Sequence, residues 1–126
     1  MLMPATGDCG HWRKQIMGQH LFDRQGETGR INLPACFDMM STYEFRNPFG
    51  KLLRDSDTKR VVVNLSNLTY IDSMGIGTLI SWEKSCKDKG KTLVLERCDS
   101  KILKMFKLAG VDRLFEFSLL GHRTES

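Results

Sequence analysis

The sequence has no apolar run long enough to cross a membrane. Its longest runs, Val61 to Val63 and the apolar residues between Ile76 and Ile80, fall far short of the ~18 residues that a membrane span requires. The first residues, MLMPATGD, have neither a basic start followed by an apolar stretch nor a cleavage site of small residues. We therefore expect a cytoplasmic protein with no secretory signal and no direct membrane insertion.

The signatures of metal sites and of common catalytic sites are also missing. The cysteines at 9, 36, 86 and 98 form no C-x-x-C pair, which argues against a zinc ribbon, a thioredoxin-like motif or a dense disulfide framework. There is no G-x-x-x-x-G-K-[S/T] loop, no G-x-G-x-x-G after a strand and no nucleophile elbow near the three scattered histidines. We expect no metal, no cofactor and no enzymatic activity.

Charge is present in both signs. The formal net charge is +4, but 19 basic residues are interleaved with 15 acidic ones, which is typical of a solvated surface. Two local segments, 84–91 and 101–107, are basic and would steer an acidic partner. Neither has the row of aromatic residues on which bases stack, so we expect no nucleic acid partner.

With 126 residues the chain has the size of one domain with one core. Residues 1–18 show no sustained hydrophobic period, and we read them as an N-terminal extension that is mobile or variable. The domain itself is expected over 19–120, with a C-terminal tail at 121–126.

The first half of this domain predicts a hairpin and a helix. Two apolar segments, 21–24 and 30–37, flank a glycine-containing turn, and Pro34 places the second strand at a sheet edge or ends it. Ser41 and Glu44 have the spacing of a capping box, and apolar residues then recur at helical spacing, which predicts a helix over 42–54. Pro48 within it would cost ~3 kcal/mol unless the helix kinks or starts late.

The second half alternates strands and helices. Strands are expected at 61–65, 92–96 and 114–117. One helix is expected from Ser73 to about Gly90, and another is expected to be capped by Asp99 or Ser100 and to stop at Gly110. Alternation of this kind predicts an α/β fold, with a mixed, mainly parallel sheet of about four to five strands, right-handed crossovers and helices packed against the sheet.

One turn carries residues that packing alone does not require. Asp72 and Ser73 stand just before the second helix, where Ser73 is expected to be the N-cap. Gly75 and Gly77 follow in its first turn, each at a cost of ~1 kcal/mol relative to alanine. Their small size serves either close packing against a strand or close approach by a partner, and the two explanations are compatible.

The stretch VVVNLSNLTYIDSMGIGTL, residues 61–79, resembles the strand, loop and helix start of the STAS family, which contains anti-sigma-factor antagonists and domains of sulfate transporters. The similarity extends over about 29–118, including LPACFD at 33–38 and CDSKILKMFKLAGV at 98–111. Three positions depart from the family pattern: Met74 replaces a second hydroxyl residue, Ala35 a glycine, and Pro48 interrupts the first helix.

This resemblance implies a STAS-like fold and a phosphoprotein that acts in signal transduction and transcription regulation by partner switching. Ser73 maps onto the phosphoacceptor, with Ser66 and Thr78 as minor alternatives. The unphosphorylated chain would bind an ATP-dependent anti-sigma factor that is also a serine kinase, phosphorylation would release it, and a PP2C-like phosphatase would reset the cycle. The expected partner-binding residues are Asp38, Asp72, Ser73, Met74, Gly75, Ile76 and Gly77.

Two other functions remain open. A STAS accessory subunit of a membrane transport complex would use the same surface without phosphorylation. A small nucleotide-binding α/β protein, or enzyme, would use Asp38, Asp72 and Ser73.

Overall fold

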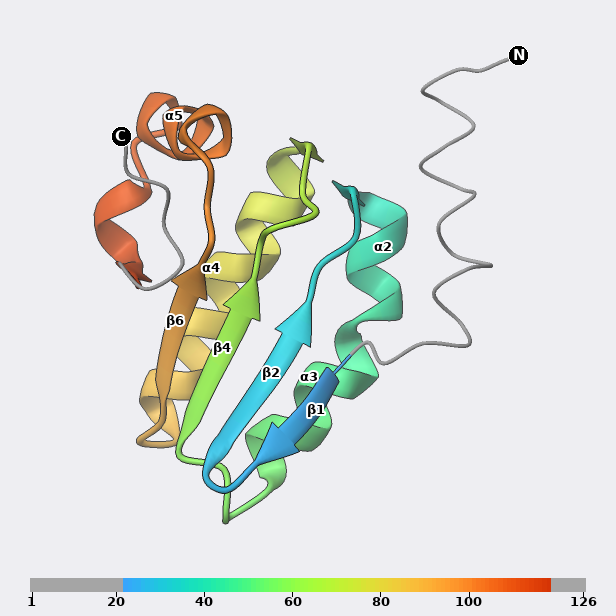
Figure 1. The fold of residues 1–126 in the computed structure, drawn as a ribbon, viewed down its shortest axis with the longest axis vertical. Helices are drawn as coiled ribbons and strands as arrows, with labels where there is room; N and C mark the ends of the chain where they lie inside the picture. The colour runs from blue at the N-terminus through green and yellow to red at the C-terminus, as the bar shows by residue number, and fades with distance from the viewer. Residues whose placement is uncertain (1–21, 119–126) are drawn as a thin grey trace.

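A computed structural model describes residues 22–118 of the chain (Figure 1). The extension expected at 1–18 and the tail expected at 121–126 lie outside the described residues. Within them, no helix is long and apolar enough to span a membrane.

A five-stranded sheet forms the centre of the domain, with the order β1-β2-β4-β6-β7. Only β1 and β2 pair antiparallel, and the other three pairs are parallel. The strands are β1 (Phe22–Gln25), β2 (Thr28–Asn32), β4 (Arg60–Asn64), β6 (Thr92–Glu96) and β7 (Glu116–Phe117). The predicted α/β fold with a mixed, mainly parallel sheet of four to five strands is confirmed.

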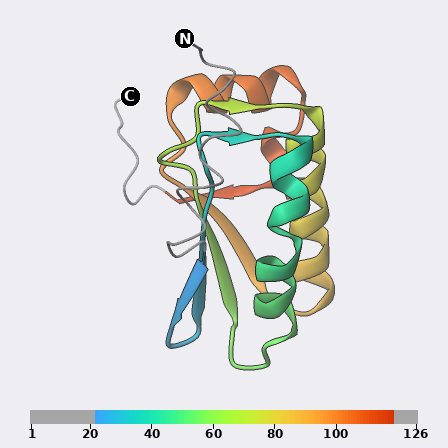
Figure 2. The same ribbon diagram turned by 90° about the vertical axis from the view of Figure 1, so that its right-hand side faces the viewer.

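Helices α2 (Met39–Glu44), α3 (Arg46–Arg54) and α4 (Ser73–Asp88) lie on one face of this sheet (Figure 2). Helix α5 (Ser100–Leu108) lies at the end of the sheet where β4 and β6 terminate, and a short 3-10 helix, η1 (Asp112–Leu114), leads into β7 (Figure 1). The core fills the space between sheet and helices. Its largest fully buried side chains include Phe37, Phe45, Phe106, Ile31, Leu65, Leu79 and Leu95.

Two buried thiols belong to this core. Cys86 of α4 is 1 % exposed and Cys98 is 4 % exposed. Burial raises the pKa of both thiols to about 12. They therefore stay protonated at neutral pH and act as small apolar side chains.

The helix predicted over 42–54 is wrong in two respects. It begins earlier, at Met39, and Phe45 divides it into α2 and α3. The break removes the problem posed by Pro48, which becomes the third residue of α3, where a backbone N–H would have no intrahelical partner. The chain thus meets the constraint of Pro48 by a break at Phe45, after which a second helix begins two residues before the proline.

The second strand of the hairpin is shorter than the predicted 30–37, because β2 ends at Asn32, before Pro34. Of the two alternatives given for Pro34, the end of the strand is confirmed and the edge position is wrong, since β2 lies between β1 and β4. Residues Cys36–Phe37 form a separate strand, β3, which pairs in parallel with β5 (Tyr70–Ile71) in a small second sheet. The last strand is shorter than the predicted 114–117, since η1 takes up residue 114.

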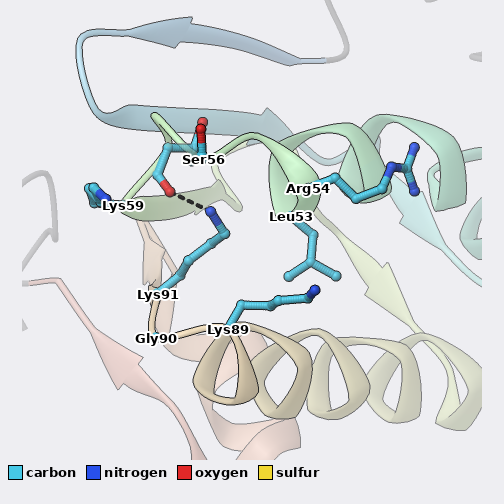
Figure 3. Close-up of a pocket in the computed structure, with 8 residues that line it drawn as sticks. Leu53, Arg54, Ser56, Lys59, Lys89, Gly90 and Lys91 are labelled. Atoms are coloured by element: carbon cyan, nitrogen blue, oxygen red, sulfur yellow. Dashed lines mark hydrogen bonds between the residues drawn. The ribbon is translucent and has the colours of Figure 1, made fainter.

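The lower end of the domain in Figure 1 is held by a lysine. Gly90 ends α4 with a φ of +73°, a conformation that glycine adopts readily. The chain then turns into Lys91, whose Nζ donates a hydrogen bond to the carbonyl oxygen of Asp55, at 2.8 Å. It donates a second hydrogen bond to the carbonyl oxygen of Thr58, at 2.5 Å, which is the dashed line in Figure 3. This ammonium joins the α4–β6 turn to the α3–β4 connection.

We predict that Lys91→Met lowers the free energy of unfolding by ~1.5–3 kcal/mol, because hydrogen bonds from a charged donor contribute about this much. The measurement is urea denaturation followed by circular dichroism. Lys89→Met is the matched control, since Lys89 is exposed and makes no such bond in the described chain. Equal stability of the two variants would contradict the role given to Lys91.

Candidate functional site

The short β3–β5 pair brings two helix starts together. Phe37 and Ile71 are partners in its register, so the next residues, Asp38 and Asp72, leave neighbouring strands side by side. The backbone N–H of Asp72 also donates to the carbonyl oxygen of Phe37, at 3.4 Å. As a result, α2 and α4 begin at the same edge of the domain, the upper end in Figure 1.

Asp72, and not Ser73, is the N-cap of α4. Its carboxylate accepts a hydrogen bond from the backbone N–H of Gly75, at 2.8 Å, and its backbone is extended. The N-cap role predicted for Ser73 is therefore wrong. Serine and aspartate are equally good caps, and the one with extended backbone takes the position.

Ser73 is instead the first helical residue, and this position changes what its hydroxyl can do. The residue is exposed, and within residues 22–118 no hydrogen bond occupies the hydroxyl. A capping oxygen would be tied to the backbone N–H groups of the next turn. Because Asp72 caps the helix instead, the Ser73 hydroxyl is exposed to solvent and has no partner in the described chain.

Asp38 caps α2 in the same way. Its Oδ1 accepts from the backbone N–H of Ser41, at 3.1 Å, and the Ser41 hydroxyl in turn accepts from the Asp38 N–H, at 3.2 Å. The predicted capping box of Ser41 and Glu44 is thus wrong: Ser41 is the third helical residue of a box that begins at Asp38. Both Asp38 and Asp72 are half-buried, and both carboxylates are used in capping.

Gly75 is required by packing. A β-carbon at this position would lie 2.1 Å from the carbonyl oxygen of Phe37 and 2.7 Å from Cγ1 of Ile71. The carbonyl oxygen of Phe37 belongs to the backbone, so it cannot move aside by a side-chain rotation. The first turn of α4 therefore rests directly on the β3–β5 pair, and any larger residue would separate them.

Packing does not require a glycine at position 77. A β-carbon there would meet nothing within 4 Å, and the residue is exposed. Among its neighbours, Met74 points outward with 51 % of its surface exposed, whereas Ile76 is partly buried and packs against the core. The two explanations offered for these glycines therefore apply to different residues. Close packing explains Gly75, whereas Gly77 lies on an open surface.

An apolar groove of about 530 Å³ runs between α2 and α4 beside Ser73. Met39, Met40, Tyr43 and Met74 line it, and each is more than half exposed. Trp82 lies deeper in the groove and is 5 % exposed; its ring stacks on Phe49 at 4.5 Å. The full lining is Met39, Met40, Thr42, Tyr43, Arg46, Met74, Thr78, Ser81 and Trp82.

Sequence reasoning missed Met39, Met40 and Tyr43. The signal was present, since apolar residues occur in segment 39–45 on more sides than one buried face can use. Phe45 enters the core, and the other three remain outside. Exposed apolar side chains that gather in one hollow indicate an interaction surface.

The electrostatic character of this edge is mixed. At the start of α4 the N–H groups of Ser73 and Met74 have no intrahelical partner, and they give this end a partial positive charge. The carboxylates of Asp38 and Asp72 lie at the same edge. Arg46, whose guanidinium lies 4.7 Å from the ring centre of Tyr43, adds a positive charge to the groove.

The fold and this edge together define a mixed α/β domain that presents a helix start and an apolar groove on one surface. A family model described as "Mlab, STAS domain" matches residues 20–120, and the chain belongs to the STAS domain family. The resemblance read from residues 61–79 is thereby confirmed.

Two curated relatives illustrate the range of the family. A STAS-domain containing protein of Pseudomonas aeruginosa is 25% identical over 93 residues, which cover 74% of this chain and 90% of that protein. The anti-sigma-B factor antagonist of Bacillus subtilis is 24% identical over 89 residues, which cover 71% of this chain and 80% of the antagonist.

Solved structures share the fold. An anti-sigma-factor antagonist (STAS) domain protein from Planctomyces limnophilus superposes with a TM-score of 0.67 at 13% identity, covering 76% of this chain and 86% of that one. The Bacillus cell fate determinant SpoIIAA in its phosphorylated form gives a TM-score of 0.61 at 16% identity, with 77% and 88% covered. A sulfate transporter family protein from Wolinella succinogenes gives 0.64 at 17% identity, with 77% and 79% covered.

The two glycines of α4 should respond oppositely to the same substitution. Gly75→Ala is expected to lower the free energy of unfolding by ~1–3 kcal/mol, because the methyl group overlaps backbone that cannot move aside. Gly77→Ala is expected to raise it by up to ~1 kcal/mol, through better helix propensity alone. Chemical denaturation of both variants tests this, and a stable Gly75→Ala protein would contradict the contact with Phe37.

Proposed function

We propose that the chain is a phospho-switch of the anti-sigma-factor antagonist type. In this proposal the unphosphorylated form binds an anti-sigma factor that is also a serine kinase, and phosphorylation of Ser73 ends the binding. ATP is bound by the partner, and a PP2C-like phosphatase removes the phosphate. The chain itself acts in the cytoplasm as a substrate and has no catalytic turnover.

The observation that carries the proposal is the state of the Ser73 hydroxyl. It is exposed, unpaired within the described residues and adjacent in sequence to Met74, which lines the apolar groove. A kinase needs an accessible hydroxyl, and a switch needs that hydroxyl at the edge of the surface it controls. Ser73 meets both conditions because Asp72 performs the capping.

The groove between α2 and α4 is the surface that we assign to the partner. Methionine side chains are unbranched and adapt to the shape of an apolar partner. Met39, Met40 and Met74 supply three of them around Trp82. The open space at Gly77, just beyond Met74, lets a partner backbone approach α4 closely.

The expected effect of phosphorylation follows from where the charge is placed. A phosphate adds about −1.5 to −2 charges at pH 7. In the free chain the unpaired N–H groups at the start of α4 stabilise this charge, so the fold tolerates it. In a complex the same dianion would be buried beside Asp38 and Asp72, and its desolvation and repulsion would cost several kcal/mol.

The relatives support the antagonist function. Curated proteins from Bacillus subtilis and Staphylococcus aureus carry the name anti-sigma-B factor antagonist, at 24% and 29% identity respectively. One structural neighbour, SpoIIAA, was solved in its phosphorylated form. Other structural neighbours are transporter proteins, and for this reason the accessory subunit of a transport complex is the competing function.

The first test is phosphate transfer. The purified chain, mixed with ATP and an anti-sigma factor kinase of the same genome, should gain one phosphate by intact mass spectrometry. Ser73→Ala should abolish the gain, whereas Ser66→Ala, which removes another exposed hydroxyl from the loop before β5, should leave it unchanged. Full modification of Ser73→Ala would show that another residue, such as Thr78, is the acceptor.

The second test is partner binding, measured by calorimetry with the same kinase. Met40→Asp places a charge in the groove and should weaken binding at least about tenfold, since burying an unpaired charge costs more than ~1.4 kcal/mol. Leu108→Asp is the matched control, because Leu108 is 79 % exposed on α5 and does not line the groove. Equal affinity of the two variants would remove the groove from the interface.

Substitution of Ser73 separates the two competing functions. Ser73→Asp should also weaken kinase binding if the chain is a switch. Stable co-purification of Ser73→Asp with subunits of a membrane transport complex would support the accessory-subunit function instead.

A further inference from the structure

A second hollow lies at the opposite end of the sheet from Ser73. It has a volume of about 390 Å³ and is bordered by two segments: the end of α3 with the connection to β4, and the turn between α4 and β6 (Figure 3). The lining residues are Leu53, Arg54, Ser56, Thr58, Lys59, Lys89, Gly90 and Lys91. Helix α4 separates it from Ser73 by 16 residues, or ~24 Å.

The hollow collects positive charge because of strand register. Arg60 and Thr92 are partners in the parallel pair of β4 and β6, so the preceding residues, Lys59 and Lys91, enter the sheet side by side. Lys89 joins them from the end of α4, and Figure 3 shows Lys91 between Lys59 and Lys89. Like charges that are grouped in this way attract an anion to the hollow.

Among residues 22–118, no acidic residue lines the hollow. The ion pairs found within residues 22–118 involve Arg24, Arg30, Lys87 and Arg97, and none involves Lys59, Lys89 or Lys91. Arg54 contributes mainly its stem, since its guanidinium lies back over Gly50.

The carboxylate of Asp55, in the same connection, is engaged elsewhere. It accepts hydrogen bonds from the Asp57 N–H, at 3.1 Å, and the Thr58 hydroxyl, at 2.9 Å, and it pairs with Arg24 at 3.1 Å. These hydrogen bonds, with the nearby charges of Arg24 and Lys91, hold the pKa of Asp55 below its usual value. The Asp55 carboxylate is thus held in place by residues 57 and 58 of its own loop and by Arg24.

Lys91 is the preorganised element of the hollow. The residue is half-buried, and its ammonium group is held in place by the carbonyl oxygens of Asp55 and Thr58. An ammonium has three N–H donors, so one remains for a ligand. The two carbonyls are neutral, but the Asp55 carboxylate is close enough for Lys91 to lower its pKa, so it offsets part of the positive charge that an entering anion meets.

We propose that this hollow binds a small anion with two linked phosphate groups. Its volume lies within the range of small-molecule sites. Three lysine ammonium groups and the hydroxyl of Ser56 supply donors for phosphate oxygens. In the part of the chain that the structure describes, the lining contains no aromatic side chain on which a base or sugar ring could stack, so recognition rests on the phosphates. This site does not depend on the Ser73 switch.

The test is calorimetric titration of the full chain with inorganic diphosphate at low ionic strength. Saturable 1:1 binding is expected, and the double variant Lys59→Gln/Lys89→Gln should weaken it about tenfold or more. The control, Lys101→Gln/Lys104→Gln, removes the same charge from exposed positions on α5 and should bind as the native chain does. Thermal melting verifies that both variants fold.

Two outcomes would overturn the proposal. The first is the absence of saturable binding, and the second is equal weakening in both double variants, which would mean that binding depends only on the net charge of the chain. A parallel arm measures sedimentation with phosphatidylcholine vesicles that contain a phosphoinositide. Sedimentation that requires Lys59 and Lys89 would identify a lipid headgroup as the source of the phosphates, whereas binding of diphosphate without sedimentation would identify a free metabolite. Because Ser73→Ala leaves the hollow intact, failure of either proposal is seen independently of the other.

Discussion

The parallel pairing of Cys36–Phe37 with Tyr70–Ile71 is the contact on which the candidate site depends. Two residues from each strand suffice to place the starts of α2 and α4 at one edge. Everything at that edge follows from this register, including both capping carboxylates, the exposed Ser73 and the groove between the helices. Gly75 preserves the arrangement, because it lets α4 rest on the backbone of Phe37.

At this edge, neighbouring residues have different roles. Asp72 satisfies the backbone at the start of α4, which leaves the hydroxyl of Ser73 unpaired in the described chain. Gly75 serves packing, while Gly77 leaves space on the outside. Structural and proposed functional roles therefore alternate along residues 72–77.

The sequence predicted best where one residue type dominates a segment. Val61 to Val63 strongly favour a buried strand, and the apolar spacing after Ser73 indicates one long helix; both are present. It predicted poorly where two local preferences compete. The spacing of apolar residues favoured a single helix over 42–54, but the break at Phe45 accommodates Pro48 in the first turn of α3. The end of β2 before Pro34 was one of the two predicted possibilities, but the pairing of β3 with a strand 34 residues further along the chain was not predicted.

The sequence drew attention to Asp72 and Ser73 but did not predict their structural roles. Asp72 and Ser73 are both good caps, and the backbone conformation that chooses between them depends on the β3–β5 pair. Met39, Met40 and Tyr43 were missed because a sequence does not reveal which apolar side chains of a short helix remain uncovered. Such exposure becomes visible only when the neighbouring elements are in place.

Trp82 links the groove to the core in a way that makes the site observable. Its indole stacks on Phe49 with an interplanar angle of 7° and lies 5.7 Å from the ring of Phe37, which belongs to β3. The chain has two tryptophans, and replacing Trp12 would leave Trp82 as a single intrinsic fluorophore. A molecule that enters the groove would then change the polarity around this indole, so the protein contains its own optical reporter of occupancy.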